Sequence, residues 1–115
     1  MIQLESYVQE SWVKGSGPAA TLVNPSTEEA LAECSTGGID FGAVVRHGRD
    51  VGGAALRAMT FAERAEMLKA LAKALHEHRE ELIDVSIRNA GTTRGDAKFD
   101  IDGATGTLSA YAYFG

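Results

Sequence analysis

The chain has 115 residues, a net charge of −5, 44 % hydrophobic residues and 23 % charged residues. The negative charge argues against a nucleic-acid partner, because proteins bind phosphates through basic side chains. No apolar run approaches the roughly 18 residues of a membrane span, and the N-terminus lacks the layout of a signal peptide. The single cysteine excludes an internal disulfide and fits a reducing compartment. We therefore expect a cytoplasmic chain of one domain at most.

Residues 1–36 are predicted to form strands and turns. Short β-type runs at Ser11–Lys14 and Thr21–Val23 flank the turn-forming "GSGP", a pattern that predicts a β-hairpin. The segment "NPSTEE" is a second turn, because Pro25 fixes its own φ and Asn24 favours turn conformations. The segment "ALAEC", at 30–34, is a third short strand.

Residues 37–115 carry the periodicity of about four helices. The first helix has Asp40 as its N-cap and is expected to stop at Gly52-Gly53. The second helix opens with a capping box formed by Thr60 and Glu63. Its apolar positions then recur at helical spacing; they are Phe61, Leu68, Leu71, Ala72 and Leu75.

The segment "HEHRE", at 76–80, is expected to break this run, and the third helix then ends at Asn89-Ala90-Gly91. After the loop "GTTRG", the last helix is predicted to be capped by Asp96. It contains Gly103 and Gly106, each of which costs about 1 kcal/mol relative to Ala. A small hairpin can hardly cover four amphipathic helices. We therefore expect this chain to be the front end of something larger.

The residues themselves indicate no active site. His76 and His78 are two apart and point to different faces of a helix, so a metal site is disfavoured. Cys34 is interpreted as a small residue that ends a strand. The glycine-rich segments lack the pattern of a dinucleotide or phosphate loop. No catalytic, cofactor-binding or metal residue is assigned from the chemistry alone.

Four segments in order resemble the N-terminal quarter of an aldehyde dehydrogenase: "SWVKGSG", "NPSTEE", "ERAEMLKALAKALHEHREELI" and "NAGTTRGDAKFDIDGATGTLSAYAYFG". The resemblance implies an α/β fold, with a hairpin and short strand (1–36) followed by helices (37–115) of the Rossmann-like cofactor-binding domain. This portion is incomplete on its own, because the catalytic domain is absent. The family's nucleophilic Cys, general-base Glu, oxyanion-binding Asn and cofactor glycine motif all lie downstream.

The resemblance therefore implies that this chain is inactive by itself and that NADP or NAD is bound outside it. The expected partners are the remainder of the dehydrogenase chain and, at full length, further copies in a homo-oligomer. The segments "LRAMTFAERAEMLKA" and "DIDGATGTL" are similar to the ring-cleavage branch of phenylacetate and benzoate catabolism, which includes the oxepin-CoA hydrolase/semialdehyde dehydrogenases. That branch oxidises a CoA-linked semialdehyde to the acid with NADP, and the phenylacetate type is favoured. The alternative is a non-catalytic helical interaction module.

Two kinds of site follow from the resemblance. Phe99 and Gly103 match positions of the last helix that border the substrate tunnel, and the alternative for Gly103 is close helix packing. Val23 and Asn89 match a monovalent-cation position of some relatives. Asn89 offers a carbonyl oxygen but no charge, which favours a turn-stabilising role instead.

Overall fold

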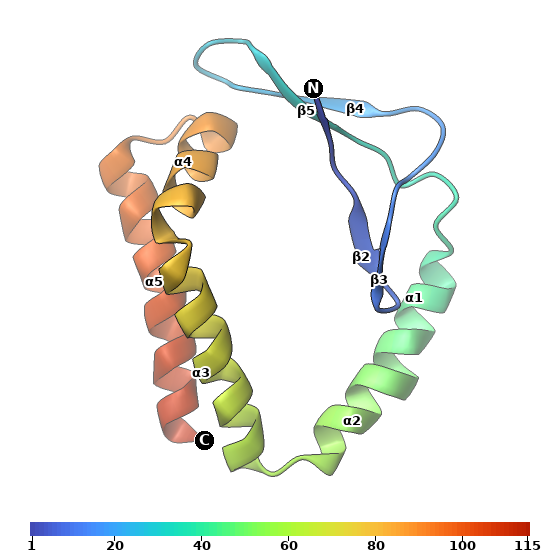
Figure 1. The fold of residues 1–115 in the computed structure, drawn as a ribbon, viewed down its shortest axis with the longest axis vertical. Coiled ribbons are helices and arrows are strands. Elements are labelled where there is room, and N and C mark those ends of the chain that lie inside the picture. Colours follow the sequence, from blue (N-terminus) through green and yellow to red (C-terminus); the bar gives the residue numbers. More distant parts are fainter. The chain divides into compact units, whose positions relative to one another are not determined.

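The computed structural model describes residues 1–115, and the chain falls into two compact units, residues 1–57 and 58–115. The first unit contains the strands and a helical run, and the second contains three helices (Figure 1). The mixed α/β class predicted from the sequence is confirmed. No helix combines the length and the apolar character needed to cross a membrane.

The first unit has five strands in two small sheets: β1 (Ile2–Gln3), β2 (Ser6–Val8), β3 (Ser11–Val13), β4 (Ala20–Val23) and β5 (Ala30–Cys34). One sheet has the order β1-β5-β4, with β1 parallel and β4 antiparallel to β5. The other sheet pairs β2 with β3 in antiparallel register. The strand predicted at "ALAEC" is confirmed, and Cys34 is its last residue.

The predicted pairing of the "SWV" and "TLV" strands is wrong. Strand β3 pairs with β2 through a turn in which Gln9 and Glu10 both have positive φ, the conformation that two-residue hairpin loops require. Strand β4 pairs instead with β5, across the "NPSTEE" turn. The Asn24 side chain closes that turn by accepting hydrogen bonds from the backbone of Ser26 at 2.9 Å and Thr27 at 3.3 Å.

The "GSGP" segment does not form the predicted hairpin turn. It runs across residues 35–37, which follow β5. A Cβ at Gly15 would lie 1.9 Å from the carbonyl oxygen of Ser35, so only glycine fits there. The buried Ser35 hydroxyl donates to the Ser16 carbonyl at 2.7 Å, and the Ser16 amide donates to the Gly37 carbonyl at 2.9 Å. These contacts satisfy backbone groups that no strand pairs.

The first helical run is longer than predicted. Helix α1 (Phe41–His47) continues through the π-helical segment η1 (Gly48–Gly52) into α2 (Gly53–Ala58). Asp40 caps its N-terminus, as predicted, by accepting from the Ala43 amide at 3.0 Å. The predicted stop at Gly52-Gly53 is wrong, because Gly53 keeps right-handed helical angles. The extra residue of a π turn carries the helix past these glycines.

The second unit contains α3 (Phe61–Glu77), α4 (Arg79–Ala90) and α5 (Arg94–Phe114). The capping box at Thr60 and Glu63 is present, with both reciprocal hydrogen bonds. The predicted break in "HEHRE" lies at His78, and Gly91 ends α4 in the left-handed conformation. The cap of the last helix is Thr93 and not Asp96: the Thr93 hydroxyl accepts from the Asp96 amide.

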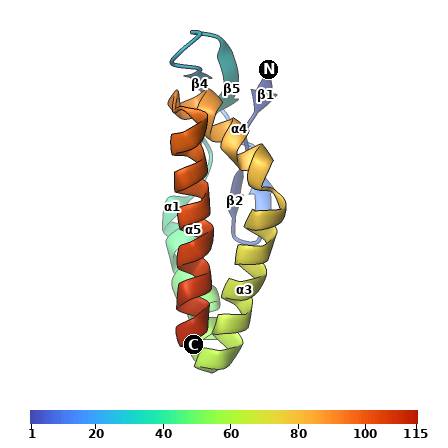
Figure 2. The same cartoon turned by 90° about the vertical axis from the view of Figure 1, so that its left-hand side faces the viewer.

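Helix α5 runs antiparallel to α3 and lies beside both α3 and α4 (Figures 1 and 2). Its inner positions recur every three or four residues, and they are Ala97, Ile101, Thr105, Leu108 and Ala112. Small residues of α3, Ala65 and Ala72, are buried in the same unit, as is Ile83 of α4, which is fully buried. Small side chains let helix axes approach closely, so the core of this unit is thin and alanine-rich.

The large apolar side chains of both units are mostly exposed. The predicted apolar face of α3 is confirmed at Ala72, with Leu68 and Leu75 half-buried, but Phe61 is 76 % exposed and Leu71 about half exposed. The Arg64 guanidinium lies 4.7 Å from the centre of the Phe61 ring. Other exposed large side chains are Ile2, Tyr7, Trp12, Phe99, Tyr111, Tyr113 and Phe114. So much exposed apolar surface favours association.

We therefore predict that residues 1–115 produced alone self-associate and unfold without a sharp transition. Burial of alanines and one isoleucine supplies little of the apolar area that stabilises a domain of this size. Sedimentation velocity and calorimetry check this prediction. A compact monomer with a cooperative thermal transition would contradict it.

Candidate functional site

The outer face of α5 holds both predicted tunnel residues. Phe99 and Gly103 are four residues apart, so they lie one above the other on the helix. Phe99 is 79 % exposed, and a Cβ at Gly103 would meet no atom within 4 Å. Within this unit, Gly103 is therefore not needed for close helix packing. That alternative has no packing partner among residues 58–115.

A shallow groove of about 470 Å³ runs along this face. Its lining residues are Gly95, Lys98, Phe99, Asp102 and Gly103. They follow the three- and four-residue spacing of one helical stripe. Two glycines leave the groove open, one aromatic ring supplies an apolar wall, and an ammonium and a carboxylate supply polar groups. We call this the α5 groove.

A chain of ion pairs connects the start of α4 to this groove. The Arg79 guanidinium donates to both carboxylate oxygens of Asp102, through Nε at 2.6 Å and Nη2 at 3.0 Å. Its third nitrogen, Nη1, donates to Glu80 at 2.8 Å, and Glu80 also accepts from Arg94. Two-point contacts of this kind fix the geometry of both partners. Acids and bases thus alternate from Asp102 to Arg94.

The ion pairs shift three pKa values. Hydrogen bonding to Arg79 holds the pKa of Asp102 below its ordinary value of 3.8. Hydrogen bonding to Arg94 likewise lowers the pKa of Glu80 below 4.5. The bond to Asp102 raises the pKa of Arg79 above its ordinary value. All three groups are therefore charged at neutral pH.

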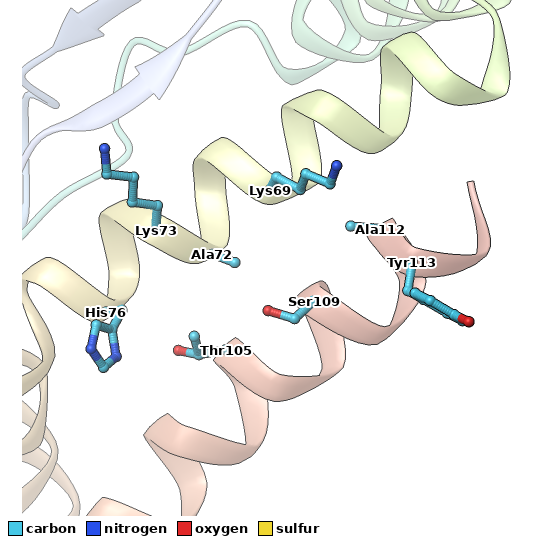
Figure 3. A pocket seen from close by; sticks show the side chains of 8 residues that line it. All are labelled: Lys69, Ala72, Lys73, His76, Thr105, Ser109, Ala112 and Tyr113. Carbon is cyan, nitrogen blue, oxygen red and sulfur yellow. The ribbon is translucent and has the colours of Figure 1, made fainter.

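A second groove, of about 580 Å³, lies between α3 and α5 (Figure 3). The small side chains of Ala72 and Ser109 face each other across it, and Lys73 extends away from α5. Its lysines are already paired: Lys69 with Glu66 at 2.9 Å, and Lys73 more loosely with Glu77 at 3.9 Å. This groove thus offers a small apolar surface, and both of its lysines already have glutamate partners.

The residues of the predicted cation position lie in different units. Val23 ends β4 in the first unit, and Asn89 lies in α4 of the second. The Asn89 amide donates to the Val85 carbonyl of its own helix at 2.9 Å, a contact that fits a local stabilising role. His78 lies 3.1 Å from Glu81, and no group of three metal-ligating side chains occurs in the chain. The cation position stays a prediction.

The sequence did not indicate the contact of Arg79 with Asp102. The two residues are 23 positions apart, and only the antiparallel return of α5 brings them together. A basic residue at the start of α4 ordinarily opposes the helix dipole. This unfavourable position of Arg79 was the one feature of the sequence that indicated an acidic partner elsewhere in the chain.

Comparison with known proteins identifies the family of this chain. Residues 12–115 match the aldehyde dehydrogenase family, and the chain belongs to that family. Solved dehydrogenase structures share its fold. It superposes on an NAD-dependent benzaldehyde dehydrogenase from Corynebacterium glutamicum with a TM-score of 0.85 and 28 % identity, covering 96 % of this chain and 24 % of that one. A betaine aldehyde dehydrogenase from Staphylococcus aureus matches with a TM-score of 0.85 and 20 % identity, covering 99 % of this chain and 24 % of that one.

Among curated proteins, the chain is 46 % identical over 114 residues to a 3,4-dehydroadipyl-CoA semialdehyde dehydrogenase from Aromatoleum evansii. The match covers 99 % of this chain and 22 % of the relative. A vanillin dehydrogenase from Corynebacterium glutamicum is 31 % identical over 91 residues, covering 78 % of this chain and 19 % of the relative. The chain thus spans about a fifth of the length of the curated relatives it matches. The predicted family and the predicted part of its fold, the N-terminal portion, are confirmed.

The ion pair predicts a specific pH dependence of stability. Because the pKa of Asp102 is lower in the folded state, the ion pair stabilises fully above the ordinary aspartate pKa. That contribution is lost as the pH falls through the native pKa. We expect Asp102→Asn in the full-length protein to lower the melting temperature at pH 7, with the difference narrowing below pH 3.8.

Asp100→Asn is the matched control, because Asp100 lies on the same helix and makes no ion pair. Thermal unfolding followed by circular dichroism from pH 7 to pH 3 measures both variants. Equal shifts for the two variants, or a shift of Asp102→Asn that does not change with pH, would refute the prediction.

Proposed function

We propose that this chain is the N-terminal segment of a cytoplasmic NAD(P)-dependent aldehyde dehydrogenase that oxidises a CoA-linked semialdehyde to the acid in aerobic aromatic catabolism. The observation that carries the proposal is the 46 % identity, over nearly the whole chain, to a dehydrogenase named for such a substrate. Family membership disfavours the alternative of a free-standing interaction module.

The proposed substrate class separates this chain from its more distant relatives. The vanillin and benzaldehyde dehydrogenases are named for small aromatic aldehydes and are 31 % and 28 % identical to this chain. The higher identity to the CoA-semialdehyde enzyme favours a CoA-linked substrate. Within that class we propose the 3,4-dehydroadipyl-CoA type first. The phenylacetate type is the second candidate, since the same segments of sequence resemble it.

The proposed cofactor is NADP, with NAD as the alternative, and no residue of 1–115 is assigned to it. The relatives support a nicotinamide cofactor, since one solved structure is of an NAD-dependent enzyme and another is in complex with NAD+. The cofactor would accept the hydride from the aldehyde. This segment contributes to the substrate side of the enzyme through the α5 groove. We further propose that the full-length chain assembles as a homo-oligomer.

Within the α5 groove, we propose that Phe99 and Gly103 border the path of the substrate. The open surface at Gly103 supports this role, because no atom lies within 4 Å of a Cβ built there. A wide CoA-linked aldehyde needs such room, whereas a small aldehyde does not. The exposed Phe99 ring offers an apolar wall next to the gap.

The first test is an assay of the full-length enzyme with purified substrates. We expect turnover of 3,4-dehydroadipyl-CoA semialdehyde, with formation of NADPH followed at 340 nm, at a kcat/KM at least about tenfold above that for benzaldehyde. The same assay with NAD in place of NADP decides the cofactor. A higher kcat/KM for benzaldehyde or vanillin would reassign the enzyme to small aromatic aldehydes.

The second test fills the gap at Gly103. Gly103→Leu should raise helix stability, since Gly costs about 1 kcal/mol in a helix interior. It should also lower kcat/KM for the CoA-linked semialdehyde much more than it lowers kcat/KM for butanal. Gly106→Leu is the matched control, because Gly106 is also exposed on α5 but does not line the groove. Equal losses for both aldehydes, or none, would remove Gly103 from the substrate path.

A further inference from the structure

The α5 groove contains a cation, Lys98, that attracts two acids, Asp102 and Glu80, without forming a contact ion pair with either. Lys98 makes no ion pair, although Asp102 lies four residues further along the same helix and also lines the groove. Lys and Asp at this spacing ordinarily attract each other on a helix surface. Asp102 is instead bound to Arg79, which occupies both of its carboxylate oxygens. The Lys98 ammonium therefore makes no contact ion pair, and its attraction to Asp102 and Glu80 acts over a longer distance.

The neighbouring charges follow the same pattern. Arg94, at the start of α5, is paired with Glu80, and Glu80 is also bound by Arg79. In the groove between α3 and α5, both lysines have glutamate partners. Of these cations around the two grooves, Lys98 alone makes no contact ion pair. An unpaired ammonium in a groove concentrates anions there.

We propose that Lys98 binds a phosphate of the substrate's carrier and that Arg79 is the positioning residue that keeps Lys98 free by holding Asp102. This inference rests on the proposed function, because a CoA-linked aldehyde carries phosphates whereas a small free aldehyde carries none. Lys98 then selects between the two classes of substrate by charge, and Gly103 selects by width. Arg79 contacts no substrate and acts only through Asp102.

The structure suggests a direct mechanism for the role of Arg79. Without the guanidinium, the Asp102 carboxylate is free to pair with Lys98 across one helical turn. The groove then presents a neutral pair of charges, and the anionic carrier is attracted less. Removing the Asp102 charge as well leaves Lys98 free again. The two substitutions together should therefore restore what the first one removes.

The first experiment substitutes Lys98 in the full-length enzyme. We expect Lys98→Gln to raise the ratio of KM for the CoA-linked semialdehyde to KM for butanal by about fivefold, the effect of one charge at about 4 Å in water. The KM of this variant should also depend less steeply on salt. Lys73→Gln is the control, because Lys73 extends away from α5 and does not line the α5 groove. An unchanged ratio in Lys98→Gln would overturn the proposal.

The second experiment tests the positioning role. Arg79→Gln should raise the same KM ratio several-fold, and Arg79→Gln with Asp102→Asn should return it to the wild-type value. Arg79→Lys should show an intermediate ratio, because an ammonium cannot bind both carboxylate oxygens in the same plane. If Arg79 served only stability, the double variant would keep the defect and both aldehydes would be affected alike. That outcome would overturn the role of Arg79.

The activity of the wild-type enzyme distinguishes a failure of the proposed function from a failure of the role proposed for Lys98. If it oxidises butanal but no CoA-linked semialdehyde, the proposed function and the role of Lys98 fail together. If it oxidises the CoA-linked semialdehyde and the Lys98 and Arg79 variants keep the wild-type ratio, only the further inference fails.

Discussion

The packing of α5 against α3 and α4 through small side chains is the constraint on which the second unit depends. Ala97 and Ala112 of α5 are buried, as are Ala65 and Ala72 of α3. Because alanine allows close approach but buries little area, these contacts hold the helices together while many of their large apolar side chains stay exposed. The aromatic rings of α5 therefore point outward, and the groove with Lys98 and Gly103 lies on an outer face of the helix bundle.

Local chemistry made most helix boundaries predictable. The capping box at Thr60, the Asp40 cap and the left-handed Gly91 each act within a few residues, so the sequence contains both partners. Asp96 is predicted as the cap of α5 because aspartate is a common N-cap residue. The cap is instead Thr93, three residues earlier, whose hydroxyl accepts the hydrogen bond. Gly52 and Gly53 resembled a helix stop because α-helical periodicity takes no account of a π turn.

Contacts between distant residues were not predictable in the same way. The pairing of β3 with β2 depends on two positive-φ residues, Gln9 and Glu10, neither of which is a usual turn residue. The bond between Arg79 and Asp102 depends on the return of α5. Phe99 and Gly103 were identified through resemblance to a family, and helical spacing alone places them on one face. The proposed role of Lys98 could not be predicted from the sequence, because helical spacing alone pairs it with Asp102.

The crossing of Gly15 and Ser35 closes part of the first unit into a ring. Ser16 and Ser35 are 19 positions apart, and one hydroxyl joins them around the β4–β5 hairpin. The entropy of closing such a ring grows only with the logarithm of its length, by about 0.6 kcal/mol for each doubling. Relatives of this chain could therefore lengthen the "NPSTEE" turn at little cost. The closure point has no such freedom, since any side chain at Gly15 would overlap the opposite backbone. A longer turn at the tip of the hairpin thus costs little, whereas a side chain at its base does not fit.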